Sequence, residues 1–388
     1  MADLENILTS LPRFREAADA LREMLLANLT MIGEIPAPTF SELDRAVFIA
    51  ERYGQCGLSG CSVDAKGNAI GMIPGTDGRQ NILLSAHSDT FVEDQQDQTI
   101  EIHADRVVGP FVGDNAIALA ALATLPTLLE KLEIRPRANV YLIAAARTLG
   151  RGNLEGIRHI FQTSGIPFAS GLCLEGLQLG RLNYASIGML RGEITCRLPD
   201  NYEWAKFGGT GSIIPISDII IRIGQIPRPQ RPLTTVIIGS VHGGISSSNI
   251  ARTTTLQFEV RSESSEIIRQ IAEQIEDITE DVAGKSGTRV ELDILAQREP
   301  GGIDIAHPLT KSARAILTKL GLQPSLYATT SMMAALRDAG IAALTLGITT
   351  GERKNELDEI DEAVAIAPMS LGMAQLVGML LAMDGGAT

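Results

Sequence analysis

The sequence contains little cysteine, few aromatic residues and less basic than acidic charge. Its 388 residues include four cysteines, 4% aromatic residues and a formal net charge of −13. Four scattered cysteines are too few for a disulfide framework or a cysteine-type zinc site. Scarce aromatic residues argue against stacking on bases or sugars as a main activity. Binding to nucleic-acid phosphates needs a basic face, so we expect no nucleic-acid partner.

Long uninterrupted apolar runs are also missing. No stretch reaches the roughly 18 consecutive apolar residues of a membrane span, and residues 1–26 carry charges throughout, unlike a secretory signal. We therefore expect a cytoplasmic protein without a membrane partner. Hydrophobic residues make up 45% of the chain, a globular composition that excludes a mainly disordered protein.

Apolar, strand-like segments alternate with helical patterns outside the middle of the chain. Residues 81–86 and 138–146 are nearly all apolar, which is typical of parallel strands covered on both faces. Helical spacing predicts one opening helix over residues 11–33 and a buried helix over residues 113–132. These patterns predict an α/β fold with a mostly parallel sheet between helices.

The middle of the chain has a different pattern. Residues 187–300 contain strand-like segments and two helical segments, which indicates a compact α+β insertion. We predict that residues 1–186 and 301–388 are the two parts of one α/β domain, and that the insertion interrupts it.

Polar residues follow the apolar runs at the place where α/β sheets bind ligands, beyond the carboxyl ends of their strands. His87 and Asp89 are two residues apart in an extended segment, so their side chains leave on the same face. A carboxylate can orient a metal-bound imidazole, and His87 with Asp114 and Glu175 is a chemically sensible zinc set. The alternative interpretation is a polar strand end with a solvated histidine and capping acids, since Asp114 or Asn115 also lies near an expected N-cap.

The succession of short motifs resembles one enzyme family. IPAPTFSELDRAVFI, SAHSDT, VGDNAIALAAL, LGRGNLEGIRHIF and LEG occur in that order. In order and spacing they resemble the co-catalytic zinc exopeptidases, which include aminoacylase, peptidase T, carboxypeptidase G and succinyl-diaminopimelate desuccinylase. The resemblance implies a zinc-peptidase-type mixed, mostly parallel sheet between helices, with residues 187–300 as an inserted lid and dimerisation domain. It also implies a homodimer formed through the lid and a small peptide or acylated amino acid as substrate.

The same resemblance implies roles for the strand-end residues. His87 would bind the first metal, Asp89 would orient it, Asp114 would bridge two metals, and Glu175 would complete the first metal's ligands. The sequence departs from the family at the general base and at the second metal. Thr148 and Leu149 stand at the family's Glu-Glu pair, and Asn355 stands at its last histidine, with Glu359 retained.

These departures have direct chemical consequences. Leu149 cannot bind a metal and Asn355 is a poor substitute for imidazole, so the second-metal site is expected to be lost. Thr148, at the general-base position, has no useful pKa near neutrality and is not expected to act as a base. The expected cofactor is one zinc ion, or none if the polar cluster persists without metal.

Four further residues have two interpretations each. Arg261 and, within one residue of register, Asn249 match substrate-binding positions of the family, but Arg261 also has acidic neighbours with which to pair. His242 would reach a substrate from the lid or would be an exposed turn histidine. Arg147 would bring positive charge to the pocket or would point into solvent.

Two functions from different classes remain. The first is a one-metal hydrolase of peptides or N-acyl amino acids with impaired or altered activity. The second is a non-catalytic homologue that binds a ligand or a partner protein. Without the resemblance, the sequence indicates a doubly wound small-molecule enzyme of unknown chemistry. No G-x-G-x-x-G segment follows a strand and no Walker motif is present, which argues against dinucleotide and P-loop functions.

Overall fold

The chain folds as two compact units in a computed structural model that describes residues 4–91, 97–200, 211–326, 328, 330–353 and 361–386. Unit 1 combines residues 1–186 with residues 302–388, and unit 2 comprises residues 187–301. The insertion predicted at residues 187–300 therefore corresponds to unit 2.

The main sheet of unit 1 is mixed, with parallel strands at its centre. In the described residues its strands are β1 (Ser59–Val63), β2 (Ala69–Ile73), β3 (Asn81–His87), β6 (Asn139–Ala145), β7 (Ser170–Glu175), β8 (Leu182–Asn183) and β15 (Ala342–Gly347). Their order is β1-β2-β6-β3-β7-β15-β8. Strands β6, β3, β7 and β15 pair in parallel, whereas β1, β2 and β8 pair antiparallel. The predicted α/β class with a mixed, mostly parallel sheet is confirmed.

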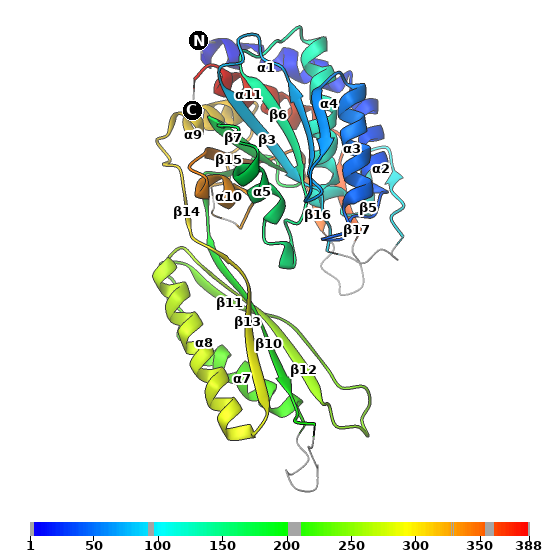
Figure 1. The fold of residues 1–388 in the computed structure, drawn as a ribbon. Helices are drawn as coiled ribbons and strands as arrows, with labels where there is room; N and C mark the ends of the chain where they lie inside the picture. Colours follow the sequence, from blue (N-terminus) through cyan, green and yellow to red (C-terminus); the bar gives the residue numbers. More distant parts are fainter. Residues whose placement is uncertain are drawn as a thin grey trace. The chain divides into compact units, whose positions relative to one another are not determined.

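Helices cover both faces of this sheet, which explains why its central strands are apolar throughout. In the described residues of unit 1, the helices are α1 (Leu4–Asp19), α2 (Arg22–Gly33), α3 (Leu43–Gln55), η1 (Val112–Ala116), α4 (Ile117–Lys131), η2 (Gly150–Gly152), α5 (Glu155–Thr163), α9 (Pro308–Lys319), α10 (Met333–Asp338) and α11 (Met369–Asp384). Side chains alternate between the two faces of a strand. Ile82 and Leu84 therefore pack under α1, α2, α3, α4, α9 and α11, while Leu83 packs against α5 and α10 (Figure 1).

One prediction about these helices is wrong. Residues 11–33 do not form one helix, because α1 ends at Asp19 and α2 begins at Arg22. Helix α1 packs on α11 whereas α2 packs on α4, and apolar spacing does not reveal that two successive segments have different partners. Asp114 and Asn115 lie directly before Ala116, the N-cap of α4, which makes no side-chain capping bond.

A small antiparallel sheet lies beside η1 in unit 1. Its strands are β4 (Glu101–Ile102), β5 (Arg106–Pro110), β16 (Gly351–Arg353) and β17 (Asp361–Ala365), in the order β16-β17-β5-β4. The register places Arg353 of β16 directly opposite Glu362 of β17. The remaining short strands are β9 (Ala185–Ser186) and β14 (Gly301–Gly302).

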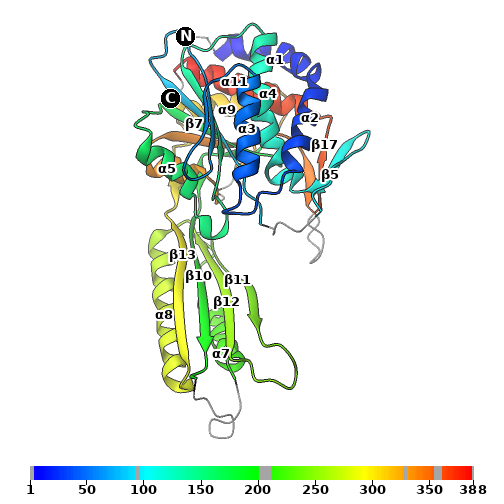
Figure 2. The same ribbon diagram turned by 45° about the vertical axis from the view of Figure 1, so that its right-hand side comes forward.

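Unit 2 is an antiparallel sheet with two helices on one face (Figure 2). Its elements are β10 (Gly188–Arg197), α7 (Ile213–Gln225), β11 (Thr234–Gly243), β12 (Thr253–Ser262), α8 (Ser265–Ser286) and β13 (Arg289–Arg298), with strand order β11-β12-β10-β13. Alternate residues of the strands, such as Ile194 and Phe258, form its core with Ile219 of α7 and Ile275 of α8. Unit 2 therefore has a hydrophobic core of its own.

Among the described residues, one helical segment is long and apolar enough to cross a membrane. It is Val112–Lys131, and 83% of its most apolar window is buried within the protein. The segment is the central core helix of unit 1, because its apolar side chains pack against the main sheet and the surrounding helices.

Candidate metal centre

His87 ends strand β3 and is almost completely buried, with 4% of its surface exposed. Its Nδ1 atom lies 3.1 Å from the backbone oxygen of Asp89, and its Nε2 atom lies 2.9 Å from Oδ1 of Asp114. Burial lowers the pKa of His87, but hydrogen bonds to Asp114 and Asp89 outweigh it and raise the pKa well above its ordinary value. A proton on Nδ1, bound to Asp89, leaves Nε2 available as a metal ligand.

Asp89 connects the end of β3 to the segment that follows β6. Its Oδ2 atom accepts hydrogen bonds from the backbone N–H groups of Thr148 and Leu149, each at 2.8 Å, and from the Thr39 hydroxyl at 2.9 Å. Its Oδ1 atom faces Nδ1 of His87 at 3.6 Å and has no hydrogen-bond partner within the described part of the chain. Asp89 therefore connects the backbone of Thr148 and Leu149 to the histidine.

Asp114 lies in η1 with backbone angles φ −129° and ψ 73°, outside helical geometry. Its Oδ1 atom faces His87, and its Oδ2 atom lies 2.6 Å from a guanidinium nitrogen of Arg353. Burial alone would raise the pKa of Asp114, but hydrogen bonding to His87 and the charges of His87 and Arg353 lower it to about 2. Asp114 is therefore ionised at neutral pH.

Glu175 ends strand β7, next to β3 in the sheet. Burial raises the pKa of its carboxyl, against the attraction of His87, and Arg181 approaches one of its oxygens at 3.9 Å. One donor atom from each of His87, Asp114 and Glu175 lies within 4.8 Å of the others. Because parallel strands end at the same sheet edge, the fold brings these residues together as predicted.

The donor set fits a divalent ion. One imidazole and two carboxylates supply nitrogen and oxygen donors that zinc accepts. Asp89, held by three hydrogen-bond donors and facing the ring of His87, is the type of second partner that fixes a ligating histidine.

Arg353 and Glu362 complete the cluster, although sequence reasoning missed both. Arg353 donates to Oε1 of Glu362 at 2.8 Å as well as to Asp114. Oε2 of Glu362 accepts from the backbone N–H groups of Gly113 and Asp114, at 2.8 and 2.7 Å. Arg353 follows the predicted strand end within three charged and glycine residues, Gly351–Arg353, but its pairing with Glu362 is not visible without the fold.

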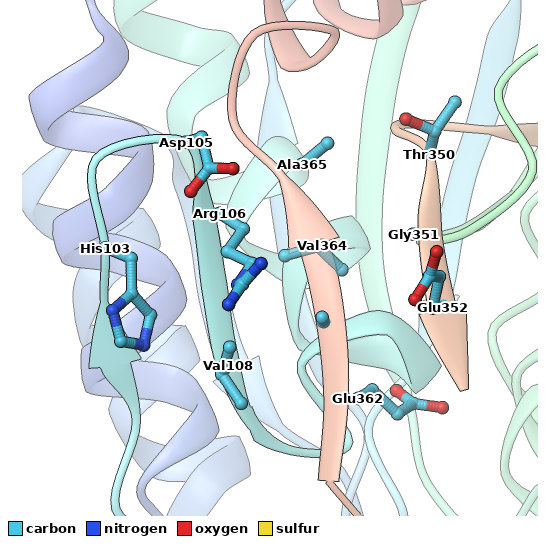
Figure 3. A pocket seen from close by; sticks show the side chains of 11 residues that line it. His103, Asp105, Arg106, Val108, Thr350, Gly351, Glu352, Glu362, Val364 and Ala365 are labelled. Atoms are coloured by element: carbon cyan, nitrogen blue, oxygen red, sulfur yellow. The ribbon is translucent and has the colours of Figure 1, made fainter. Parts of the chain in front are cut away.

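A hollow of about 620 Å³ lies along the small sheet, next to the cluster. Its lining includes His103, Arg106, Glu352 and Glu362 (Figure 3). Glu362 is thus shared between this hollow and the network around Asp114.

Three further predicted residues are Arg147, Asn355 and Glu359. Arg147 does not point freely into solvent: its guanidinium bonds to Glu155 at 3.1 Å and lies 5.5 Å from the ring centre of Phe40. Asn355 and Glu359 lie outside the described residues.

Three predicted substrate-binding residues belong to unit 2. Arg261 forms an ion pair with Glu259, an acidic neighbour two residues earlier in the sequence. Asn249 donates to Oγ of Ser246 at 2.8 Å in an exposed turn. His242 is exposed on strand β11, not in the turn that follows.

Comparison with known proteins agrees with this architecture. Residues 97–286 match the family model of the peptidase dimerisation domain, and they include most of unit 2. No curated protein matches the chain in sequence.

Several solved peptidase structures share the fold over nearly the whole chain. The dipeptidase Dug1p of Saccharomyces cerevisiae has a TM-score of 0.78 at 14% identity, covering 97% of this chain and 99% of its own. Aminopeptidase PepT of Bacillus cereus has a TM-score of 0.68 at 18% identity, covering 94% and 99%. The YXEP protein of Bacillus subtilis, a dinuclear metal-binding peptidase of the M20 family, has a TM-score of 0.62 at 16% identity, covering 95% and 99%.

The two-unit fold carries a cluster of metal-binding residue types at the carboxyl edge of its sheet, and the solved structures named above are peptidases that share this fold. Residues 97–286, just under half of the chain, thus match the peptidase dimerisation domain, and the chain shares the fold of solved M20 family peptidases.

Proposed function

We propose that this protein is a hydrolase of peptides or N-acyl amino acids that holds one divalent ion on His87, Asp114 and Glu175, and that its activity is impaired. The observation that carries the proposal is the identity of the two residues whose backbone binds Asp89, Thr148 and Leu149. The backbone N–H groups of Thr148 and Leu149 bind Asp89, which faces His87, and the side chains at these two positions are a hydroxyl and an aliphatic group. Neither supplies a carboxylate to hold a second ion or to remove a proton from water.

The side chains of the cluster have distinct roles in this proposal. Zinc held here would polarise a carbonyl group and make water more acidic. Asp89 keeps the Nε2 atom of His87 directed toward the ion, and Arg353 pairs with Asp114. Glu175 supplies the second carboxylate, whose burial raises its pKa and so favours pairing with a cation.

The weak step is proton transfer. A positioned general base contributes about 10²–10⁴-fold to rate, and Thr148 cannot replace one. Glu362 is a further carboxylate of the network around Asp114, but its two oxygens already accept hydrogen bonds from Arg353 and from two backbone N–H groups. We therefore expect slow turnover even with the metal bound.

The second candidate function is a non-catalytic homologue that binds a ligand or partner. The observation in its favour is the ion pair between Arg353 and Asp114, which neutralises part of the metal-binding charge without any metal.

Metal content separates the two candidates. Purified without chelator and titrated with Zn²⁺, Mn²⁺ or Co²⁺, the protein is expected to bind one ion per chain. The variant His87→Ala is expected to lose it. His307→Ala is the matched control, since His307 caps helix α9 by accepting from the backbone N–H of Leu309. A chain that binds none of the three ions would contradict the metal-site proposal and favour the second candidate.

Restoring the missing groups tests the impaired activity. Thr148→Glu, Leu149→Glu and Asn355→His together are expected to raise hydrolysis of dipeptides or N-acyl amino acids by about 10²-fold or more. If the parent already hydrolyses them as fast as the restored variant, the proposal of a damaged site is wrong.

We also propose that the protein is a cytoplasmic homodimer formed through unit 2. Strand β11 is an edge of the unit 2 sheet and exposes Ile237 by 39% and Val241 by 46%, which suits symmetric pairing with a second copy. Ile237→Lys with Val241→Lys is expected to yield monomers in light scattering. A dimer mass retained in this variant would exclude β11 as the interface.

A further inference from the structure

We propose that Arg353 is a fixed cation of the centre, which occupies the second oxygen of Asp114 and thereby limits the centre to one metal ion. This inference rests on the proposed one-metal function and deepens it. Under this inference a second ion is excluded by Arg353 itself, as well as by the absence of the second-metal ligands.

The guanidinium of Arg353 is held by two carboxylates at once. One nitrogen lies 2.6 Å from Oδ2 of Asp114 and another lies 2.8 Å from Oε1 of Glu362. A planar guanidinium with several fixed donors suits such bridging.

Glu362 anchors the guanidinium to the backbone. Its side chain is 7% exposed, and its other oxygen accepts from the N–H groups of Gly113 and Asp114. Because Glu362 is also the cross-strand neighbour of Arg353 in the β16–β17 ladder, the backbone itself sets their separation. Moving Arg353 away would therefore leave two largely buried carboxylates without their cation.

Asp114 can then serve only one metal. Its Oδ1 atom lies 2.9 Å from Nε2 of His87 and is the oxygen that we assign to the proposed metal site. Its Oδ2 atom is already bound to a cation that does not release its charge at any physiological pH. A second divalent ion on Oδ2 would have to displace the guanidinium or lie beside it against electrostatic repulsion.

Removing the guanidinium would release the ligands for a second ion. In Arg353→Met, Oδ2 of Asp114 and Oε1 of Glu362 would face the same space without a cation between them. Carboxylates with water molecules are ligands that suit Mn²⁺. The variant is therefore expected to bind a second Mn²⁺ ion that the parent does not bind.

The test is the Mn²⁺ stoichiometry of the full chain, measured by equilibrium dialysis with elemental analysis. Electron paramagnetic resonance separately distinguishes an isolated ion from a spin-coupled pair. We expect one ion in the parent, two in Arg353→Met, and one in Arg353→Lys, which keeps the positive charge. Arg353→Gln, which retains hydrogen-bonding groups, replaces Arg353→Met if the latter does not fold. Arg222→Met, which removes a half-buried arginine paired with Asp281 at 2.6 Å in unit 2, is the matched control and is expected to stay at one.

Three outcomes would overturn the inference: two ions in the parent, one ion in both neutral Arg353 variants, or two ions in Arg353→Lys. A parent that binds no ion would instead contradict the proposed function, so the two failures are distinguishable.

Discussion

Removal of the Asp89 carboxylate is the perturbation whose effect the structure defines best. Asp89 is 0% exposed, and its Oδ2 atom accepts from the N–H groups of Thr148 and Leu149 and from the Thr39 hydroxyl. In Asp89→Ala these N–H groups lose their acceptor. A buried donor without a partner costs about 1–3 kcal/mol, so we expect the free energy of unfolding to fall by about 2–5 kcal/mol.

Asp89→Asn separates this structural role from the orientation of His87. The amide oxygen can still accept from the two N–H groups, so the loss of stability should be smaller, about 1–2 kcal/mol. The carboxylate that faces Nδ1 of His87 is nevertheless gone. Removal of such a partner typically weakens metal binding by about 10–100-fold, and we expect that loss in both variants.

Urea denaturation in the presence of chelator measures stability without a contribution from bound metal, and zinc titration calorimetry measures affinity. Asp97→Ala is the matched control, because Asp97 also accepts from one backbone N–H and one hydroxyl, both from Thr99, but in an exposed position. There water replaces the lost acceptor, and the change should stay within about 0.5 kcal/mol. If Asp89→Ala is no more destabilising than this control, the described role of Asp89 is wrong.

Three further predictions concern residues away from the metal ligands. Despite burial, which raises it, the pKa of Glu259 is lowered by the guanidinium groups of Arg191 and Arg261. Its ionised form therefore stabilises the folded chain above the unfolded-state pKa of 4.5, and that contribution is lost as pH falls through the lower folded pKa. Denaturation of Glu259→Gln should show a deficit at neutral pH that disappears in acid, and a constant deficit would refute the assignment. Arg45→Met should cost about 3–5 kcal/mol, because Arg45 is 1% exposed and its guanidinium donates to three backbone carbonyl groups; a loss below 1 kcal/mol in urea titration would contradict this. Gly372→Ala should lower the melting temperature strongly, since an added Cβ would lie 1.9 Å from the carbonyl oxygen of Ile348, whereas Gly224→Ala, with open space at that position, should not.

The centre and its surroundings differ in how far the sequence predicted them. The apolar segment before His87 indicated a strand covered on both faces, and the two-residue spacing to Asp89 placed both side chains together. The same order of strands placed Glu175, Thr148 and Leu149 at the same sheet edge. These inferences were possible from the sequence because they depend on local periodicity and on the common direction of parallel strands.

Other features required the folded chain. The break between α1 and α2 depends on which helix each one packs against, and apolar spacing does not contain that information. Arg45 is a buried arginine within a helix whose sequence is amphipathic, and only the packing shows that its donors bind the carbonyl groups of Gly33, Ile35 and Ser88.

By itself, then, the sequence determined the α/β class, the inserted unit, and the residue types at the ends of β3, β6 and β7, including the threonine and the leucine beside Asp89. The tertiary structure alone decided that Arg353 lies between Asp114 and Glu362. That ion pair depends on the register of β16 against β17 and on the position of η1, more than 200 residues earlier in the chain. Periodicity reports which face of an element is buried, whereas the partner of a charge is set by long-range packing.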